Sequence, residues 1–269
     1  WGDCSGSLIF DDIVLTSASC VDSLNPDGTT HIRIGNNVRG KETVGSEKRI
    51  IAQRAKHPWY NPDTPKYDFG ILHLDQPTVV NGYIKVNKDY KVPAEEEKVN
   101  VVGMGLFPKE EQETTTDNAE EGGGGGEGLL QLEQIILQVV SHDKCLEHGV
   151  GIQRDIHMCA GVAGDDKSVC TKDRLVAGNP VMYWKGEAPI QVGLVSRGLG
   201  CKEGTKTYAF ARLSHNVVDW IDEKVCEFAS YPPSSCTSGN GDDDDDDDDD
   251  KDDMMESTSQ QEAADYMTF

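Results

Sequence analysis

The chain has 269 residues and a formal net charge of −23, with 48 acidic residues against 25 lysines and arginines. A charge of this sign repels phosphate and no basic stripe occurs, so the composition argues against a nucleic-acid-binding protein. No stretch approaches the roughly 20 apolar residues that span a bilayer, which argues against a membrane span.

The acidity is concentrated in two segments. Residues 237–269 hold fourteen acidic residues and one lysine, and residues 107–128 hold seven acidic residues and one lysine, so the two segments carry −13 and −6 of the total charge. Segments this polar cannot bury enough apolar surface to fold. The sequence therefore predicts one folded domain over 1–236, with an acidic glycine-rich insert at 107–128, followed by a disordered Asp-rich tail over 237–269.

Short apolar runs predict strands along the folded region. Ser7–Phe10 and Ile13–Thr16 are separated by two aspartates, a hairpin pattern. His31–Gly35 alternates polar and apolar residues, as a half-buried strand does. Further strands are expected within residues 49–52, 99–105, 130–140, 191–196 and 206–213.

A single good helix is expected, over Leu213–Phe228. Its apolar residues recur at three- and four-residue spacing, at Val217, Val218, Ile221, Val225 and Phe228. Many short strands, Gly and Pro turns and one terminal helix indicate an all-β fold of the barrel type.

Three segments carry a resemblance to a known family. Leu15–Cys20 (LTSASC), Tyr67–Leu74 (YDFGILHL) and Val176–Pro180 (VAGNP) resemble the L-T-A-A-H-C, D-I-A-L-L-x-L and G-D-S-G-G-P motifs of the chymotrypsin/trypsin-like serine proteases (peptidase S1). Shorter matches lie at His57–Asn61, Met158–Gly161 and Val192–Ser196. The resemblance covers the chain from about Cys4 to about Cys226.

The resemblance implies two six-stranded antiparallel β-barrels with a C-terminal helix. In the family a first strand with an I-V-G-G start precedes these motifs, and we expect it, with any signal peptide, upstream of Trp1 and missing from this chain.

The eight cysteines indicate an oxidising compartment. Their number is even, their spacings are wide and no C-x-x-C pair occurs, which is typical of disulfides and not of a zinc site. The family resemblance implies the pairs Cys4–Cys20, Cys145–Cys159 and Cys170–Cys201, which leaves Cys226 and Cys236 as a fourth. We therefore expect a secreted or extracellular protein.

The resemblance also implies that the catalytic machinery is degenerate. Asp68 keeps the triad carboxylate, whereas Ser19 stands at the position of the general-base histidine and Ala177 at that of the nucleophilic serine. A serine triad needs the hydroxyl to attack, the imidazole to take its proton and the carboxylate to orient the imidazole. The sequence therefore argues against peptide hydrolysis and predicts no cofactor and no metal at the site.

The loop around Ala177 has two registers. Counting back from Pro180 places Leu175 at the oxyanion-hole glycine and Val176 at the buried aspartate that receives the activated N-terminus. Counting forward from Cys170 places Asp173 and Arg174 at the buried aspartate and the nucleophile. Neither register supplies a serine nucleophile.

The positions that resemble the specificity pocket are also altered. Ser168 lies at the pocket base, Lys206 replaces a small wall residue, and Arg197 replaces the tryptophan before Gly198. One interpretation is a remodelled cleft that binds an acidic ligand. The other, which we favour, is drift in a pocket that is no longer used.

No histidine is expected to replace the lost base. His57 matches a surface loop of the family. His73 lies five residues along the strand from Asp68, about 16 Å, which is too far to share its site.

The run Asp242–Asp250 is expected to be extended. Carboxylate oxygens suit Ca²⁺, so weak multivalent binding of Ca²⁺ or of a basic protein is one interpretation, and a solubilising tail is the other.

Three functions follow from these observations. The leading hypothesis is a non-catalytic serine protease homologue that acts as a secreted binding or regulatory module with a protein partner. The alternatives are an active S1 endopeptidase with an altered active site, and an acidic extracellular cation- or protein-binding protein that acts through its tail.

Overall fold

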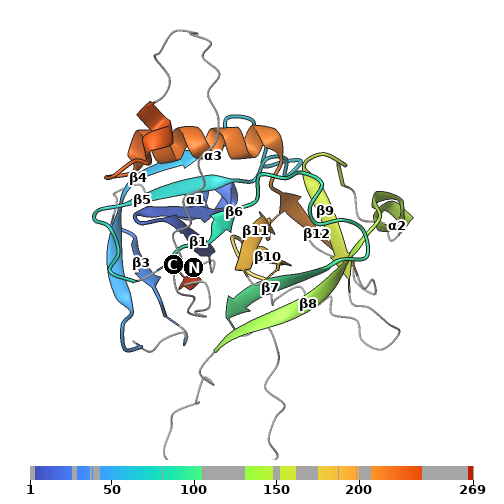
Figure 1. Ribbon diagram of the computed structural model, residues 1–269, viewed down its shortest axis with the longest axis horizontal. Helices are drawn as coiled ribbons and strands as arrows, with labels where there is room; N and C mark the ends of the chain where they lie inside the picture. The colour runs from blue at the N-terminus through green and yellow to red at the C-terminus, as the bar shows by residue number, and fades with distance from the viewer. Residues whose placement is uncertain are drawn as a thin grey trace, which may run out of the picture.

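The computed structural model describes residues 4–25, 29–36, 38, 43–80, 82–104, 131–147, 152–161, 175–186, 188–197, 199, 207–237 and 266–268. These residues form two β-barrels that lie side by side, and helix α3 (His215–Phe228) crosses the top of the first (Figure 1).

The first barrel is closed and antiparallel, in the order β1-β13-β3-β4-β5-β2. Apolar side chains on the inward faces of its strands form the core, as Ile32 and Ile34 show by alternating with the more exposed His31 and Arg33. The strands are β1 (Ser5–Phe10), β2 (Ile13–Thr16), β3 (His31–Ile34), β4 (Glu47–Lys56), β5 (Gly70–Leu74) and β13 (Tyr266–Thr268).

The second sheet runs in the order β10-β7-β8-β9-β12-β11-β6, and an additional β10–β11 pairing closes its first six strands on one another. The seventh, β6, pairs in parallel with β11. The expected pair of six-stranded barrels is thus confirmed, with β6 as an addition. The strands are β6 (Lys85–Val86), β7 (Lys98–Met104), β8 (Leu132–Val140), β9 (His157–Gly161), β10 (Pro180–Lys185), β11 (Ala188–Leu194) and β12 (Thr207–Arg212).

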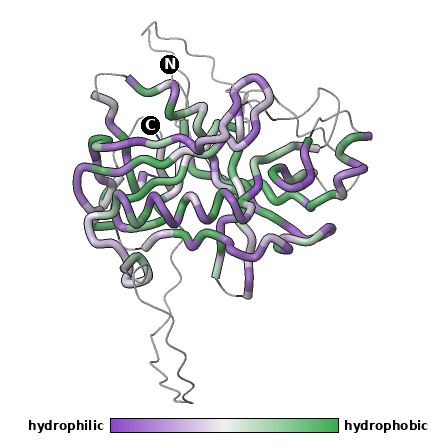
Figure 2. Tube along the Cα trace, turned by 90° about the horizontal axis from the view of Figure 1, so that it is seen from above, coloured by the Kyte–Doolittle hydropathy of each residue, from purple (hydrophilic) through white to green (hydrophobic). Residues whose placement is uncertain are grey.

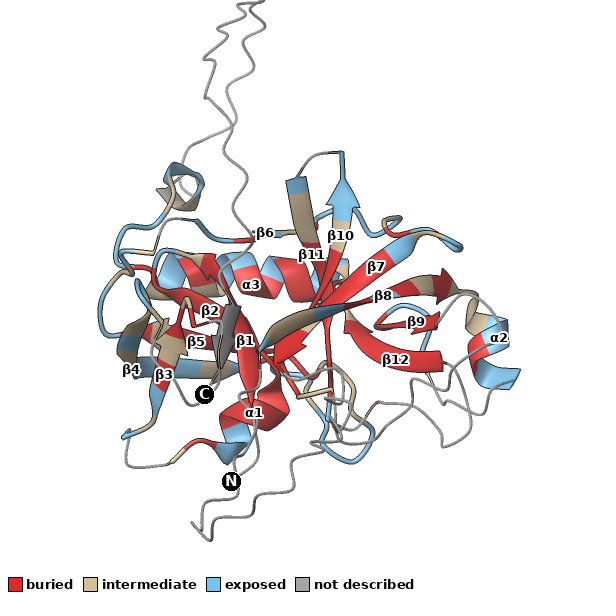
Figure 3. Cartoon of the chain, turned by 90° about the horizontal axis from the view of Figure 1, so that it is seen from below, coloured by how far each residue is buried: buried red, intermediate tan, exposed pale blue. Residues whose placement is uncertain are grey.

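Helix α3 confirms the C-terminal helix that the apolar spacing predicts, although it begins two residues later, after the N-cap Ser214. Its hydrophilic and hydrophobic residues alternate along the tube in Figure 2, and its inward face is buried in Figure 3. That face packs against residues of both barrels, including Leu15 of β2 and Leu194 of β11, so the core is continuous between them.

Short helical segments were not expected from the sequence. They are α1 (Ala18–Ser23), α2 (His142–Glu147) and the 3₁₀ helix η1 (Ser234–Thr237). At four to six residues they are too short to show the helical periodicity on which the prediction relied. No helix among the described residues combines the length and apolar character needed to cross a membrane.

The C-terminal segment differs from the expected disordered tail. Tyr266–Thr268 form β13 inside the first barrel, with partners on both sides. A strand of three residues in a polar segment is too short to show the alternation of apolar and polar residues from which strands are predicted. The acidic insert at 107–128 and residues 238–265 lie outside the described part of the chain.

Disulfides close loops at three places. Cys4–Cys20, Cys145–Cys159 and Cys226–Cys236 are bonded, with Cα atoms 5.8, 6.2 and 5.4 Å apart. Each pair is one of those expected from the sequence. The fourth expected pair, Cys170–Cys201, lies outside the described residues.

Candidate active site

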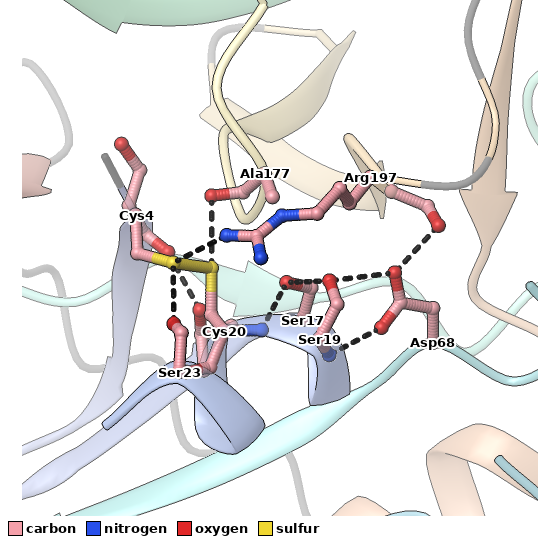
Figure 4. The surroundings of a disulfide bond; sticks show 11 residues. Cys4, Ser17, Ser19, Cys20, Ser23, Asp68, Ala177 and Arg197 are labelled. Carbon is pink, nitrogen blue, oxygen red and sulfur yellow. Dashed lines mark hydrogen bonds between the residues drawn. A yellow bond between two sulfur atoms is a disulfide. The ribbon is translucent and has the colours of Figure 1, made fainter. Parts of the chain in front are cut away.

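The candidate site lies where loops of the two barrels meet. Ser19 belongs to α1, which follows β2, and Asp68 lies just before β5, so both come from the first barrel. Ser196 and Arg197 follow β11 of the second barrel, and Ala177 precedes β10. The structure therefore brings together residues that are far apart in the sequence (Figure 4).

The carboxylate of Asp68 is the centre of the site and is almost fully buried. Its Oδ1 accepts the backbone N–H of Ser19 at 2.7 Å. Its Oδ2 accepts the hydroxyl of Ser19 at 3.1 Å and the hydroxyl of Ser196 at 2.5 Å. A buried carboxylate is costly unless hydrogen bonds compensate for lost hydration, and these three donors supply that compensation.

Ser19 is held in place by the start of α1. The N-cap residue Ser17 accepts the backbone N–H of Cys20 through its hydroxyl at 3.1 Å, as capping serines do. The hydroxyls of Ser17 and Ser19 lie 3.0 Å apart. Ser19 is thus fixed between the helix cap and Asp68, and its side chain occupies the space beside the carboxylate.

Ala177 lies against the Cys4–Cys20 disulfide. The backbone N–H of Ser5 donates to its carbonyl oxygen at 2.9 Å, and the Sγ of Cys20 lies 3.4 Å from the same oxygen. The next residue, Gly178, has a φ of +88°, and a Cβ there would lie 1.8 Å from the carbonyl oxygen of Ser5. Only glycine permits this approach, which holds the Ala177 loop on β1.

Arg197 faces the disulfide and not the carboxylate. One guanidinium nitrogen lies 3.7 Å from the Sγ of Cys4, and Figure 4 shows the side chain stretched across the disulfide. Among the described residues, the hydrogen-bond donors to Asp68 are therefore two hydroxyl groups and one backbone N–H. Burial, followed by the negative charges of Asp68 and Asp22, raises the pKa of Tyr60 to about 12.

Histidines supply no base to this carboxylate within the described residues. The nearest candidate in sequence is His73, whose Nε2 lies 3.3 Å from Oδ2 of Asp12 and not at Asp68. His57 lies in the loop that its sequence context suggested, but its side chain is 3% exposed and stacks on Tyr67 with ring centroids 4.8 Å apart. Its ring also packs against Trp59 of the same segment and Trp220 of α3. The contact with α3 cannot be read from the loop motif alone.

The pocket residues expected from the sequence are only partly described. Leu175 is partly buried and packs against the core of the second barrel. Arg197 lies at the site, as above. Outside the described residues are Ser168, Asp173, Arg174, Gly198 and Lys206. No group of three potential metal ligands occurs in the described part of the chain.

Ser196 is the site residue that sequence reasoning missed. Its segment was read only as a strand motif, Val192–Ser196, and nothing in one sequence shows which carboxylate a serine will contact. With Ser196 included, the site holds two hydroxyls on one carboxylate. A carboxylate is a much weaker base than an imidazole, so it is poorly suited to removing a hydroxyl proton at neutral pH.

Comparisons with known proteins agree with this architecture. The family model of trypsin matches residues 2–221. Submandibular glandular kallikrein-9 of Rattus norvegicus is 26% identical, over 83% of this chain and 81% of the relative. Serine protease 28 of Mus musculus is 25% identical, over 82% and 77%. The vitellin-degrading protease of Bombyx mori is 26% identical, over 82% and 76%.

Proposed function

The chain belongs to the trypsin family of serine proteases, and we propose that within this family it is a non-catalytic homologue, secreted as a binding or regulatory module. The observation that carries the proposal is the environment of Asp68. Its carboxylate is occupied by the hydroxyls of Ser19 and Ser196 and by a backbone N–H, where a triad would require an imidazole.

The chemistry supports the same conclusion. Ala177 has only a methyl side chain to present beside the disulfide, so it cannot attack a carbonyl carbon. The Ser19 hydroxyl has a carboxylate as its base and donates its hydrogen bond to it. Loss of either the serine or the histidine of a catalytic pair costs on the order of 10⁶-fold in turnover.

The extracellular location rests on cysteine use and on the family. Three disulfides among the described residues fit an oxidising compartment. The relatives include a glandular kallikrein and a serine protease. The ligand class that we propose for such a homologue is a protein partner.

Two measurements on the purified full chain test the proposal. We expect no hydrolysis of a panel of peptide substrates and no labelling by a fluorophosphonate, which reacts only with an activated serine. An active trypsin-family protease serves as the positive control for both. Turnover that a serine-directed inhibitor abolishes, or labelling at any serine of this chain, would establish the alternative of an active endopeptidase with an altered site.

A further inference from the structure

The C-terminal strand β13 occupies a central position in the first barrel. It pairs antiparallel with β1 through Ser5–Thr268, Gly6–Met267 and Ser7–Tyr266. On its other side it pairs antiparallel with β3 through Ile34–Met267 and Arg33–Thr268. The short strand beside β1 at the C-terminal end of the chain is visible in Figure 1.

We propose that β1 and β3 form a strand-binding site, and that its occupant is the C-terminal segment Tyr266–Thr268 of the same chain. This inference goes beyond the proposed function, because it concerns the closure of the first barrel and not the catalytic state. The recognition is by main-chain hydrogen bonds on both edges, the mode by which an extended peptide adds to an open sheet.

The need for an occupant follows from the barrel order. Among the described strands, β1 pairs otherwise with β2, and β3 pairs otherwise with β4. Without β13, residues 5–7 of β1 and 33–34 of β3 would therefore become open edges. An open edge exposes unpaired N–H and C=O groups and invites pairing with another chain. Closing the barrel removes both edges at once.

The β1 side of the site is held by contacts that do not involve β13. The backbone N–H of Ser5 donates to the carbonyl oxygen of Ala177 at 2.9 Å. The hydroxyl of Ser7 donates to the side-chain oxygen of Gln191 in the second barrel at 2.5 Å. These contacts hold β1 in position independently of β13, so the site is preorganised for an incoming strand.

The connecting chain is long enough to deliver the strand. Residues 238–265 separate η1 from β13. An extended chain spans about 3.3–3.6 Å per residue, so this segment reaches roughly 90 Å, well beyond the width of a barrel. Closing so long a loop adds only a slowly growing entropic cost.

The experiment compares two proline variants of the full chain by hydrogen–deuterium exchange. Met267→Pro removes an N–H from the middle of β13, where proline is not tolerated. Met254→Pro makes the same chemical change in the same tail, outside β13. We expect the amides of β1 and β3 that face β13, within residues 6–7 and 33–34, to exchange about tenfold faster or more in Met267→Pro and at the wild-type rate in Met254→Pro, whereas the Ser5 amide, which donates to Ala177, should not change. Equal exchange in both variants overturns the proposal.

A cross-link decides the case if Met267→Pro fails to fold. Directly opposite residues of paired strands lie close enough for a disulfide. The double variant Arg33→Cys with Thr268→Cys should form an intramolecular disulfide, whereas Arg33→Cys with Thr258→Cys, the matched control, should not. Equal cross-linking of both pairs, or of neither, overturns the proposal. Cross-linked dimers would overturn it as well, because the occupant would then be the strand of a second copy.

Discussion

The hydroxyls of Ser19 and Ser196 donate to the same oxygen, Oδ2 of Asp68. Ser19 belongs to the first barrel, whereas Ser196 lies just after strand β11 of the second. The carboxylate therefore joins the two barrels. A residue that resembles a catalytic carboxylate now has the contacts of a structural one, and its removal should be felt as lost stability.

We expect Asp68→Ala to lower the free energy of unfolding by on the order of 3 kcal/mol, because it leaves two buried hydroxyls and a buried N–H without their acceptor. Denaturant unfolding followed by fluorescence measures the change. The matched control is Asp22→Ala in α1, whose carboxylate pairs with Lys56 at the exposed surface and should contribute about 1 kcal/mol or less. Similar losses from both variants would contradict the structural role of Asp68.

Restoring the two lost catalytic side chains should give little activity. In Ser19→His with Ala177→Ser, the base and nucleophile return, but Leu175 and Val176 remain in the segment that resembles the oxyanion loop. A residue with a Cβ resists the backbone conformation that points an N–H at the oxyanion. Peptidase assays and fluorophosphonate labelling of the double variant check this. Robust turnover would show that the loop already forms a working oxyanion hole.

Acid should destabilise the fold through two buried histidines. Burial lowers the pKa of His57 and of His157 below the ordinary value of 6.5. In each, Nδ1 accepts a backbone N–H, from Trp59 at 3.2 Å and from Gln153 at 3.0 Å, and a protonated ring would lose that bond.

The sign follows from proton uptake. Below about pH 6.5 the unfolded chain binds protons at these rings that the folded chain excludes, so the free energy of unfolding falls as pH falls, by up to about 1.4 kcal/mol per pH unit for each ring. His57→Asn keeps an acceptor for Trp59 and should show a shallower slope below pH 6.5. His31→Asn, at an exposed position, is the control. A slope unchanged by His57→Asn would contradict the assignment.

The aspartate run should bind Ca²⁺ weakly. Nine successive carboxylates repel one another, so a divalent cation is favoured. If the run is extended, as the sequence predicts, it would hold no fixed set of six or more oxygens around one ion. Calorimetry should show low affinity that falls with salt and is shared with Mg²⁺. Replacing Asp242–Asp250 by asparagine keeps the length of the tail and leaves β13 unchanged, and should abolish the binding. Equal binding by both proteins would move the metal to the folded domain.

How far the sequence predicts this molecule depends on the range of each interaction. The helix α3 follows from local apolar spacing. The two barrels and the place of Asp68 follow from the resemblance of short motifs to the trypsin-like family, because each motif lies within a few consecutive residues. The contact of Ser196 with Asp68 joins residues 128 positions apart and has no local signature. The burial of His57 depends likewise on Trp220 of α3, whose ring centroid lies 5.1 Å away.

Because β13 pairs with both β1 and β3, Tyr266–Thr268 are held in the first barrel by backbone pairing as well as by the chain that precedes them. A single protease cut within residues 238–265 would break the covalent link to β13 and turn the last residues of the chain into a separate peptide, held only by its pairing with β1 and β3. The fraction of protein that keeps the peptide would then depend on concentration and on the dissociation rate, as for any ligand. Cleavage would thus convert β13 from a permanent part of the barrel into a strand that another peptide can replace.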